Sequence, residues 1–193
     1  MRTDAMHAKP GWGRVRGVLP LALPECPIEQ AIRARDARAQ AALLDEAQKR
    51  PDRSTDAWLV ADADGVRAIA RTEGALRRLV SDIVERHAPE VVAGAPRVRY
   101  AHRPTLSEPW MRIAASGPAA LLPLVLRDLE RRRGRTLRVT DHGGPFEMQA
   151  EAPLANLLGY ADWYEELCEG RGWLAIGLAR YAPVDVDPGP DAA

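Results

Sequence analysis

The densest group of residues that could do chemistry is a run of arginines in the second half of the chain. Five fall within eight positions: Arg131, Arg132, Arg133, Arg135 and Arg138. Guanidinium groups match the geometry of phosphate oxygens, and such clusters provide sequence-independent affinity for RNA. A second interpretation is a solvated helix end, where cations stabilise the helix dipole. The residue types alone leave both interpretations open.

A second basic group is expected on one face of a sheet in the first half: Arg67, Arg71, Arg97 and Arg99. These arginines indicate either a solvated sheet face or a surface that binds RNA or a protein. Neither half has the paired aromatic residues on which an RNA-recognition motif stacks bases. In the second half, Glu147, Gln149 and Glu151 are predicted to point outward and to repel RNA from that sheet.

Residues that could hold a metal or form a catalytic group are scattered. His7, His87 and His102 have no ligand spacing with Cys26 or Cys168. The DHGG sequence at 141–144 is typical of a hairpin turn. We therefore expect no metal, no cofactor, no small-molecule substrate and no enzymatic activity.

The net charge excludes a global attraction to nucleic acid or membranes. The 193 residues carry 27 basic and 27 acidic groups. Residues 108–138 have seven basic and three acidic residues (+4), whereas residues 139–193 have two and ten (−8). No uncharged stretch is long enough to span a bilayer, and the lone cysteines predict a reduced, cytoplasmic protein. The acidic segment favours the alternative of a protein-interaction or regulatory module.

Hydrophobic spacing predicts a β-α-β-β-α-β order in the first half. Residues 14–23 have apolar side chains at every second position, typical of a strand, and residues 28–50 have an apolar stripe at helical spacing. Further on we expect a hairpin with strands at 57–61 and 66–71, a helix around 76–84 and an extended stretch at 91–100.

The second half repeats this order. It has a strand at 110–114, a helix opened at 116–118 with Gly134 as its C′ residue, a hairpin of strands 137–140 and 146–152, a helical stripe from Leu154 and a closing strand at 173–178. Two such units predict an α+β fold of two ferredoxin-like sandwiches in tandem. The expected domains are 14–103 and 104–183, with an N-terminal extension at 1–13 and a disordered tail at 184–193. The closing strand is an apolar edge, so we expect the other domain or a partner to cover it.

Several short motifs now fall in one order: SEP at 107–109, RRRG at 131–134, DHGG at 141–144, APL at 152–154, GYA at 159–161, GRG at 170–172 and YAP at 181–183. In this order they resemble domain V, the C-terminal domain of translation elongation factor G. The resemblance implies contact with large-subunit ribosomal RNA. It adds His142 and Arg171, which lie within the motifs, to the candidate contacts. Glu165 stands where the family tends to have Arg, a departure that weakens part of this contact.

Upstream, GAPRVRY at 94–100 resembles the end of domain III of the same factor. The family's GTPase domain and domain IV have no counterpart, because neither Lys9 nor Lys49 follows the glycines of a phosphate loop and residues 103–107 are too few for a domain. The resemblance therefore implies a non-catalytic protein that binds the ribosome, with a separately encoded GTPase as a possible partner. The alternatives are an interaction module that kept the fold, or the remnant of a degraded translation factor.

Overall fold

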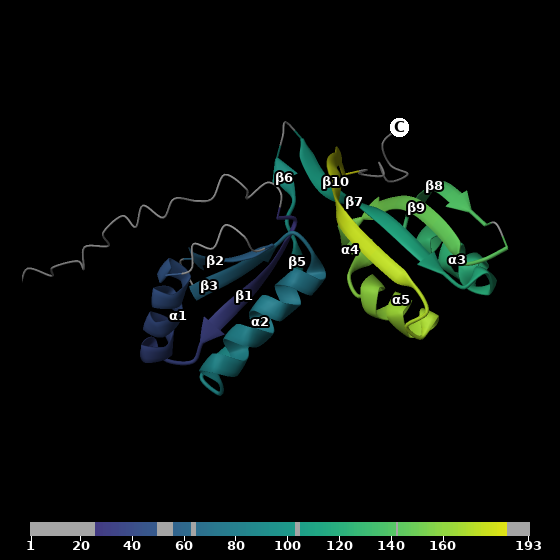
Figure 1. Cartoon of the computed structure of the whole chain (residues 1–193). Coiled ribbons are helices and arrows are strands. Elements are labelled where there is room, and N and C mark those ends of the chain that lie inside the picture. The colour runs from purple at the N-terminus through teal and green to yellow at the C-terminus, as the bar shows by residue number, and fades with distance from the viewer. Residues whose placement is uncertain (1–25, 50–55, 63–64, 103–104, 142, 185–193) are drawn as a thin grey trace, which may run out of the picture.

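The computed structural model describes residues 26–49, 56–62, 65–102, 105–141 and 143–184. Figure 1 shows two sheets that stand side by side as separate bodies, each with its own helices. The predicted strand at 14–23, the extension at 1–13, residues 185–193 of the predicted tail and His142 lie outside the described residues. The predicted domain boundaries stay predictions.

The first domain consists of five strands and two helices. Its sheet has the order β2-β3-β1-β4, with β5 paired to β1, and the strand pairs between them are antiparallel. The elements are β1 (Ile28–Ala34), α1 (Ala37–Lys49), β2 (Ala57–Asp62), β3 (Gly65–Ala70), α2 (Glu73–His87), β4 (Val91–Ala93) and β5 (Arg97–Val98). This strand order, with two crossover helices, is the ferredoxin-like arrangement.

The prediction of one helix over residues 28–50 is wrong. The segment divides into β1 and α1. Ile28 and Ile32 are both buried, and a spacing of four fits a helix as well as a strand with a period of two. The helix begins after Asp36, whose carboxylate Oδ1 accepts a hydrogen bond from the amide of Ala39 at 2.8 Å. Asp is a preferred helix N-cap, and that signal marks the true start.

The second domain repeats the topology with the strand order β10-β7-β9-β8, and β6 pairs with β7. Its elements are β6 (Ala101–His102), β7 (Leu106–Gly117), a 3₁₀ turn (Ala119–Leu121), α3 (Leu122–Arg131), β8 (Arg135–Thr140), β9 (Phe146–Pro153), α4 (Leu154–Leu157), α5 (Tyr160–Cys168) and β10 (Trp173–Pro183). The α+β fold of two ferredoxin-like sandwiches is therefore confirmed.

Alternation along β9 places the core of the second domain. Phe146, Met148, Ala150 and Ala152 are buried beneath the helices, as predicted. Glu147 and Gln149 point to the opposite face and are exposed. We call this opposite, helix-free side of the second sheet the open face.

The end of α3 differs from the prediction. Gly134 is not the C′ residue, because the helix has Arg132 as its C-cap and Arg133 takes the left-handed conformation with φ of 60°. The amide of Arg133 donates to the carbonyl of Glu130 at 3.0 Å, and the amide of Gly134 donates to the carbonyl of Leu129 at 2.7 Å. These two bonds form a Schellman motif. Gly134 is required one position later, where a Cβ atom would lie 2.7 Å from the Leu129 carbonyl oxygen.

The two domains touch through the start of α2. The Glu73 carboxylate accepts a hydrogen bond from the Gly159 amide at 2.9 Å, and Arg77 forms a two-pronged contact with Asp162 at 2.8 and 2.7 Å. Thr72 caps α2 and thereby fixes the position of Glu73. These contacts join the first domain to the N-terminal end of α5, and we call them the interdomain contact.

The closing strand β10 is an edge strand of the second sheet, as the topology requires. Its residues alternate: Leu174, Ile176 and Leu178 pack partly against the core, whereas Trp173 is 52% exposed. Trp173 therefore lies at the surface of the second domain and not in its core. Whether a partner covers the edge stays a prediction.

Candidate nucleic-acid interface

The arginines after α3 do not act as one group. Arg132 points inward, where its Nε donates to Asp128 Oδ2 at 2.6 Å and its guanidinium donates to the carbonyl of Asn156 at 2.7 Å. The same guanidinium lies 5.2 Å from the ring centre of Tyr160. Its hydrogen bonds and ring contact assign Arg132 to the packing of α3 against α4 and α5. Its candidate role in RNA contact stays a prediction.

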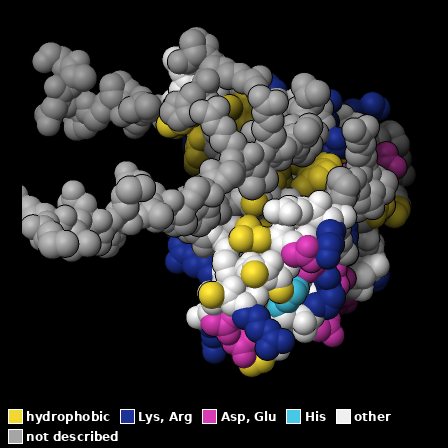
Figure 2. Space-filling model, turned by 90° about the vertical axis from the view of Figure 1, so that its left-hand side faces the viewer, with side chains coloured by type: hydrophobic (Ala, Val, Ile, Leu, Met, Phe, Trp, Pro, Cys, Tyr) yellow, Lys and Arg dark blue, Asp and Glu magenta, His cyan; other side chains and the backbone are white. Residues whose placement is uncertain are grey.

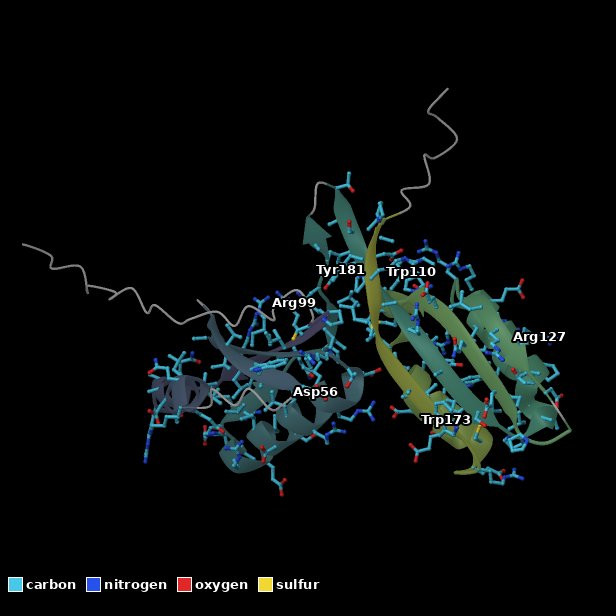
Figure 3. All side chains as sticks on the ribbon, turned by 45° about the horizontal axis from the view of Figure 1, so that its top comes forward. Asp56, Arg99, Trp110, Arg127, Trp173 and Tyr181 are labelled. Atoms are coloured by element: carbon cyan, nitrogen blue, oxygen red, sulfur yellow. The ribbon has the colours of Figure 1, made fainter. Side chains whose placement is uncertain are left out.

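Arg131 lies on the exposed side of the same helix. It shares a groove of about 310 Å³ with Leu124, Arg127, Trp163 and other residues of α3 and α5. Figure 3 shows Arg127 on this outer helical side, away from β10. Arg131 is therefore separated from the arginines that follow it in β8.

The arginines of β8 reach the open face. In the strand register, Arg135 is paired with Glu151 and Arg138 with Gln149. Arg138 makes no ion pair with any residue in the described part of the chain and is exposed. Arg133, just before the strand, lies with its Nη2 3.6 Å from Oε1 of the buried Glu108.

Glu151 is the centre of the open face. Its side chain is only 4% exposed, yet three arginines surround it. Arg112 Nη2 lies 3.0 Å from Oε1, Arg135 Nη2 lies 3.6 Å from Oε2, and Arg180 forms a close ion pair with Oε2. Hydrogen bonds from Arg180 and Arg112 lower the pKa of Glu151 below its ordinary value, although burial opposes this. We call these four residues the Glu151 cluster.

Glu151 lies on the outward face of β9, as predicted, but its carboxylate is buried among arginines instead of being exposed to solvent, and the repulsion of RNA stays a prediction. A buried charge needs partners, and three guanidinium groups share this one carboxylate, so the cluster has an excess of two positive charges. Arg112, Arg135 and Arg180 remain between 43% and 66% exposed, so their outer N–H groups face solvent. The centre of the sheet is basic rather than acidic.

Sequence reasoning missed Arg112 and Arg180. Arg112 lies on β7 directly opposite Glu151, and Arg180 comes from β10 with its guanidinium 5.1 Å from the ring centre of Trp110. Along β7, Arg112 alternates in step with Trp110 and Ala114, so all three lie on the same face of the sheet. This alternation points to Glu151 only when the pairing of β7 with β9 is known.

The second basic group lies on the corresponding face of the first sheet. Arg67 and Arg99 both pair with Glu29, at 2.7 and 3.3 Å, and Arg71 lies 3.9 Å from Asp56. Arg97 is paired in register with Glu29 and is exposed. This register is consistent with the prediction that the four arginines share one sheet face. Glu29 neutralises part of the positive charge of that face.

Two further candidates lie elsewhere. Arg171 follows α5 and pairs with Glu169 at 2.9 Å in an exposed turn. His142 belongs to the part of the chain that the structure leaves undescribed. Neither is brought to the Glu151 cluster by the described geometry.

The outer end of the first domain has charges of both signs around a histidine (Figure 2). His87 Nε2 lies 2.7 Å from Glu46 Oε2, and Arg86 pairs with Glu46 and Asp82. Burial opposes the ionisation of Glu46, but hydrogen bonds from His87 and Arg86 outweigh it and lower the pKa of this carboxyl. These pairs join α1 to α2. Among the described residues no group of three or more ligand-type side chains could hold a metal ion.

Comparison with known proteins shows which family the second domain resembles. Residues 105–191 match the family model described as elongation factor G C-terminus. The second domain is therefore similar to the C-terminal region of elongation factor G. Elongation factor G 2 of Anaeromyxobacter dehalogenans (strain 2CP-C) is 34% identical over 82 residues, which are 42% of this chain and 12% of that protein. The aligned part of the chain thus spans about an eighth of this curated relative.

The likeness in fold extends beyond the elongation factor G C-terminal region. A crystal structure from Thermus thermophilus superposes with a TM-score of 0.57 over 83% of this chain and 41% of its own, at 15% identity. Coverage of that extent requires both domains, so the tandem arrangement is shared as a fold. The resemblance of residues 14–103 to domain III in particular stays a prediction. No helix in the described ranges has the length and apolar character needed to cross a membrane.

Proposed function

We propose that this translation-factor-like protein binds ribosomal RNA through the open face of its elongation factor G C-terminal domain. The observation that carries the proposal is the Glu151 cluster, in which three exposed arginines share one buried carboxylate. A fixed carboxylate holds the guanidinium groups in place, so binding a phosphate costs less side-chain entropy. Arg138, which has no ion pair among the described residues, extends the basic surface along β8.

The family resemblance supplies the biological setting of the proposal. The relative named above is an elongation factor G, which favours the ribosome, and its large subunit in particular, as the source of the RNA. We further propose that the protein is non-catalytic and cytoplasmic and that a separately encoded GTPase is a possible partner. Isothermal calorimetry with GTP tests the proposal that the protein is non-catalytic. A micromolar affinity for GTP would contradict that proposal.

Co-sedimentation with purified ribosomal subunits at two salt concentrations tests the RNA contact. Each phosphate contact releases counterions, so binding should weaken steeply with salt, and each lost contact should lower the log–log slope by about one. The test variants are Arg112→Ala, Arg135→Ala and Arg138→Ala, which leave Arg180 on Glu151. Arg138→Ala should change the melting temperature little, because exposed substitutions are usually worth within about 0.5 kcal/mol. Arg112→Ala and Arg135→Ala should lower it, because each removes a partner of the buried Glu151 carboxylate, so circular dichroism must show that each variant is folded at the temperature of the binding assay.

Arg38→Ala is the matched control, since Arg38 is exposed on α1 at the far side of the first domain. It removes one positive charge without touching the open face. Equal binding by the control and by each of the three test variants at both salt concentrations would contradict the proposal.

A second candidate function is protein binding by the helical side of the same domain. Leu124 is 49% exposed and lies in the groove with Trp163 and Leu167, flanked by Arg127 and Arg131. Binding through the three apolar side chains of this groove would depend less on salt than binding through the arginines of the open face. Leu124→Gln should abolish ribosome binding if this surface is responsible, and should leave it unchanged if the open face is responsible.

A further inference from the structure

The open face has three zones along β10. Arg180 lies towards one end, and the other residues of the Glu151 cluster lie beside it in the row of Gly177. In the middle, Ala175 is paired with Ala114, and Gly177 is paired with Arg112. These small residues leave the middle of the sheet flat at its β10 side, and a Cβ atom at Gly177 would meet nothing within 4 Å.

Trp173 occupies the other end. It is paired with Ser116, so it has the same parity as Ala175 and Gly177 and belongs to the open face. Trp173 is 52% exposed, and its neighbour Leu174 rather than Trp173 packs towards the core. Figure 3 shows Trp110 and Trp173 near opposite ends of this sheet.

The two ends are separated by a distance that suits a short nucleic-acid segment. Four steps of a strand, from Trp173 to Gly177 in the row of Arg112 and Arg135, cover about 13 Å. This equals about four stacked bases at roughly 3.4 Å each. A charged end, a flat middle and an aromatic end match the features of single-strand binding surfaces.

We infer that the open face binds a single-stranded RNA segment, with a base stacked on Trp173 and phosphates held by Arg112, Arg135 and Arg138. The inference rests on the proposed function and specifies its ligand. In a duplex, bases stack on one another within the helix, and protein contacts fall on the 2′-hydroxyl and phosphate groups. A duplex can therefore use the arginines but not Trp173, which makes the single strand the favoured ligand.

Two RNA probes separate the inference from the proposed function: a fluorescently labelled oligouridylate of about 12 nucleotides and a blunt RNA duplex of the same length. Trp173→Ala should weaken oligouridylate binding at least about fivefold, because base–aromatic stacking contributes at least ~1 kcal/mol per base. Duplex affinity and the salt slope of both probes should stay unchanged. Trp173→Phe should restore most of the single-strand affinity, since a phenyl ring also stacks.

Arg135→Ala should weaken both probes and reduce their salt slopes by about one. If Trp173→Ala leaves oligouridylate binding unchanged, or weakens both probes equally, the stacking inference is overturned while the arginine contact stands. If the wild-type protein binds neither probe at low salt, both the inference and the RNA contact fail. Circular dichroism melting of each variant confirms that folding is retained.

Discussion

At the scale of single residues, Glu151 shows how burial changes the meaning of a charge. An exposed carboxylate on a sheet face repels phosphate, whereas this buried one organises three arginines. Its nearest partners come from positions 39 and 29 residues away along the chain. That arrangement depends on two strand pairings, so no local sequence pattern could predict it.

Replacing this carboxylate should lower both the stability of the protein and its affinity for RNA. We expect Glu151→Gln to lower the free energy of unfolding at pH 7 by about 1–3 kcal/mol, because charge-assisted hydrogen bonds to Arg112 and Arg180 are lost. RNA affinity should fall, because the three arginines lose the carboxylate that holds them in place, and the removal of one negative charge offsets part of this loss. Urea denaturation and oligouridylate titration measure the two effects, with the exposed Glu147→Gln as control.

The difference in stability between the wild type and Glu151→Gln should become smaller as the pH falls. The pKa of Glu151 is lowered in the folded protein, so its contribution is fully present above the ordinary carboxyl pKa and is lost as pH falls through the folded value. The difference between wild type and Glu151→Gln should therefore be constant near neutrality and shrink below about pH 4.5. A difference that grew on acidification would contradict this assignment.

At the scale of elements, the alternation of β9 was predictable because one face is wholly apolar. The segment at 28–50 was not, because the spacing of Ile28 and Ile32 satisfies two periods and the capping role of Asp36 decides between them. The predicted C-terminus of α3 was one residue too late, because the prediction gave the left-handed position after the helix to the glycine. Glycine usually takes the left-handed position, but here close approach to Leu129 fixes Gly134 after it.

Paired substitutions at this helix end should have opposite effects. Arg133→Gly should raise the free energy of unfolding by up to about 1 kcal/mol, because the left-handed conformation costs a non-glycine residue ~1–2 kcal/mol. The weak ion pair with Glu108 offsets part of this gain. Gly134→Ala should cost about 1–3 kcal/mol, since its Cβ would clash with the Leu129 carbonyl oxygen. Thermal melting of both variants tests the assignment.

Arg132→Ala should also destabilise the protein, in contrast to Arg131→Ala. It removes hydrogen bonds to Asp128 and to the Asn156 carbonyl, for an expected loss of about 1–3 kcal/mol. Arg131 has no ion pair within the described ranges, so its replacement should change the melting temperature little. Equal melting temperatures for the two variants would show that Arg132 does not hold α3 against α5.

At the scale of the whole molecule, two repeats of one topology were predictable from the sequence, but their mutual contact was not. Arg77 and Asp162 are 85 positions apart, and each looks like an ordinary charge on an exposed helix face. Their pairing depends on how two complete domains meet. The same limit applies to Arg180, which reaches Glu151 only because β10 closes the sheet beside β7.

Removing Arg77 should loosen the arrangement of the domains without unfolding either. Arg77 and Asp162 are each about half exposed, so their pair is worth little stability, about 0–1 kcal/mol. We expect Arg77→Ala to broaden the distance distribution between spectroscopic labels on α1 and β8, with unchanged melting. Salt should broaden the wild-type distribution in the same direction. Arg78→Ala, on the adjacent position of α2, is the control.

The carboxylate of Glu73 has a consequence for how the molecule unfolds. It sits at the first turn of its own helix and receives the amide of Gly159, the residue from which α5 begins. This hydrogen bond therefore links the first turn of α2 to the residue before α5, across the two domains. Unfolding of the first domain removes the acceptor of the Gly159 amide, and buried residues of both domains form one hydrophobic cluster, so the domains should melt with positive cooperativity rather than as two independent transitions.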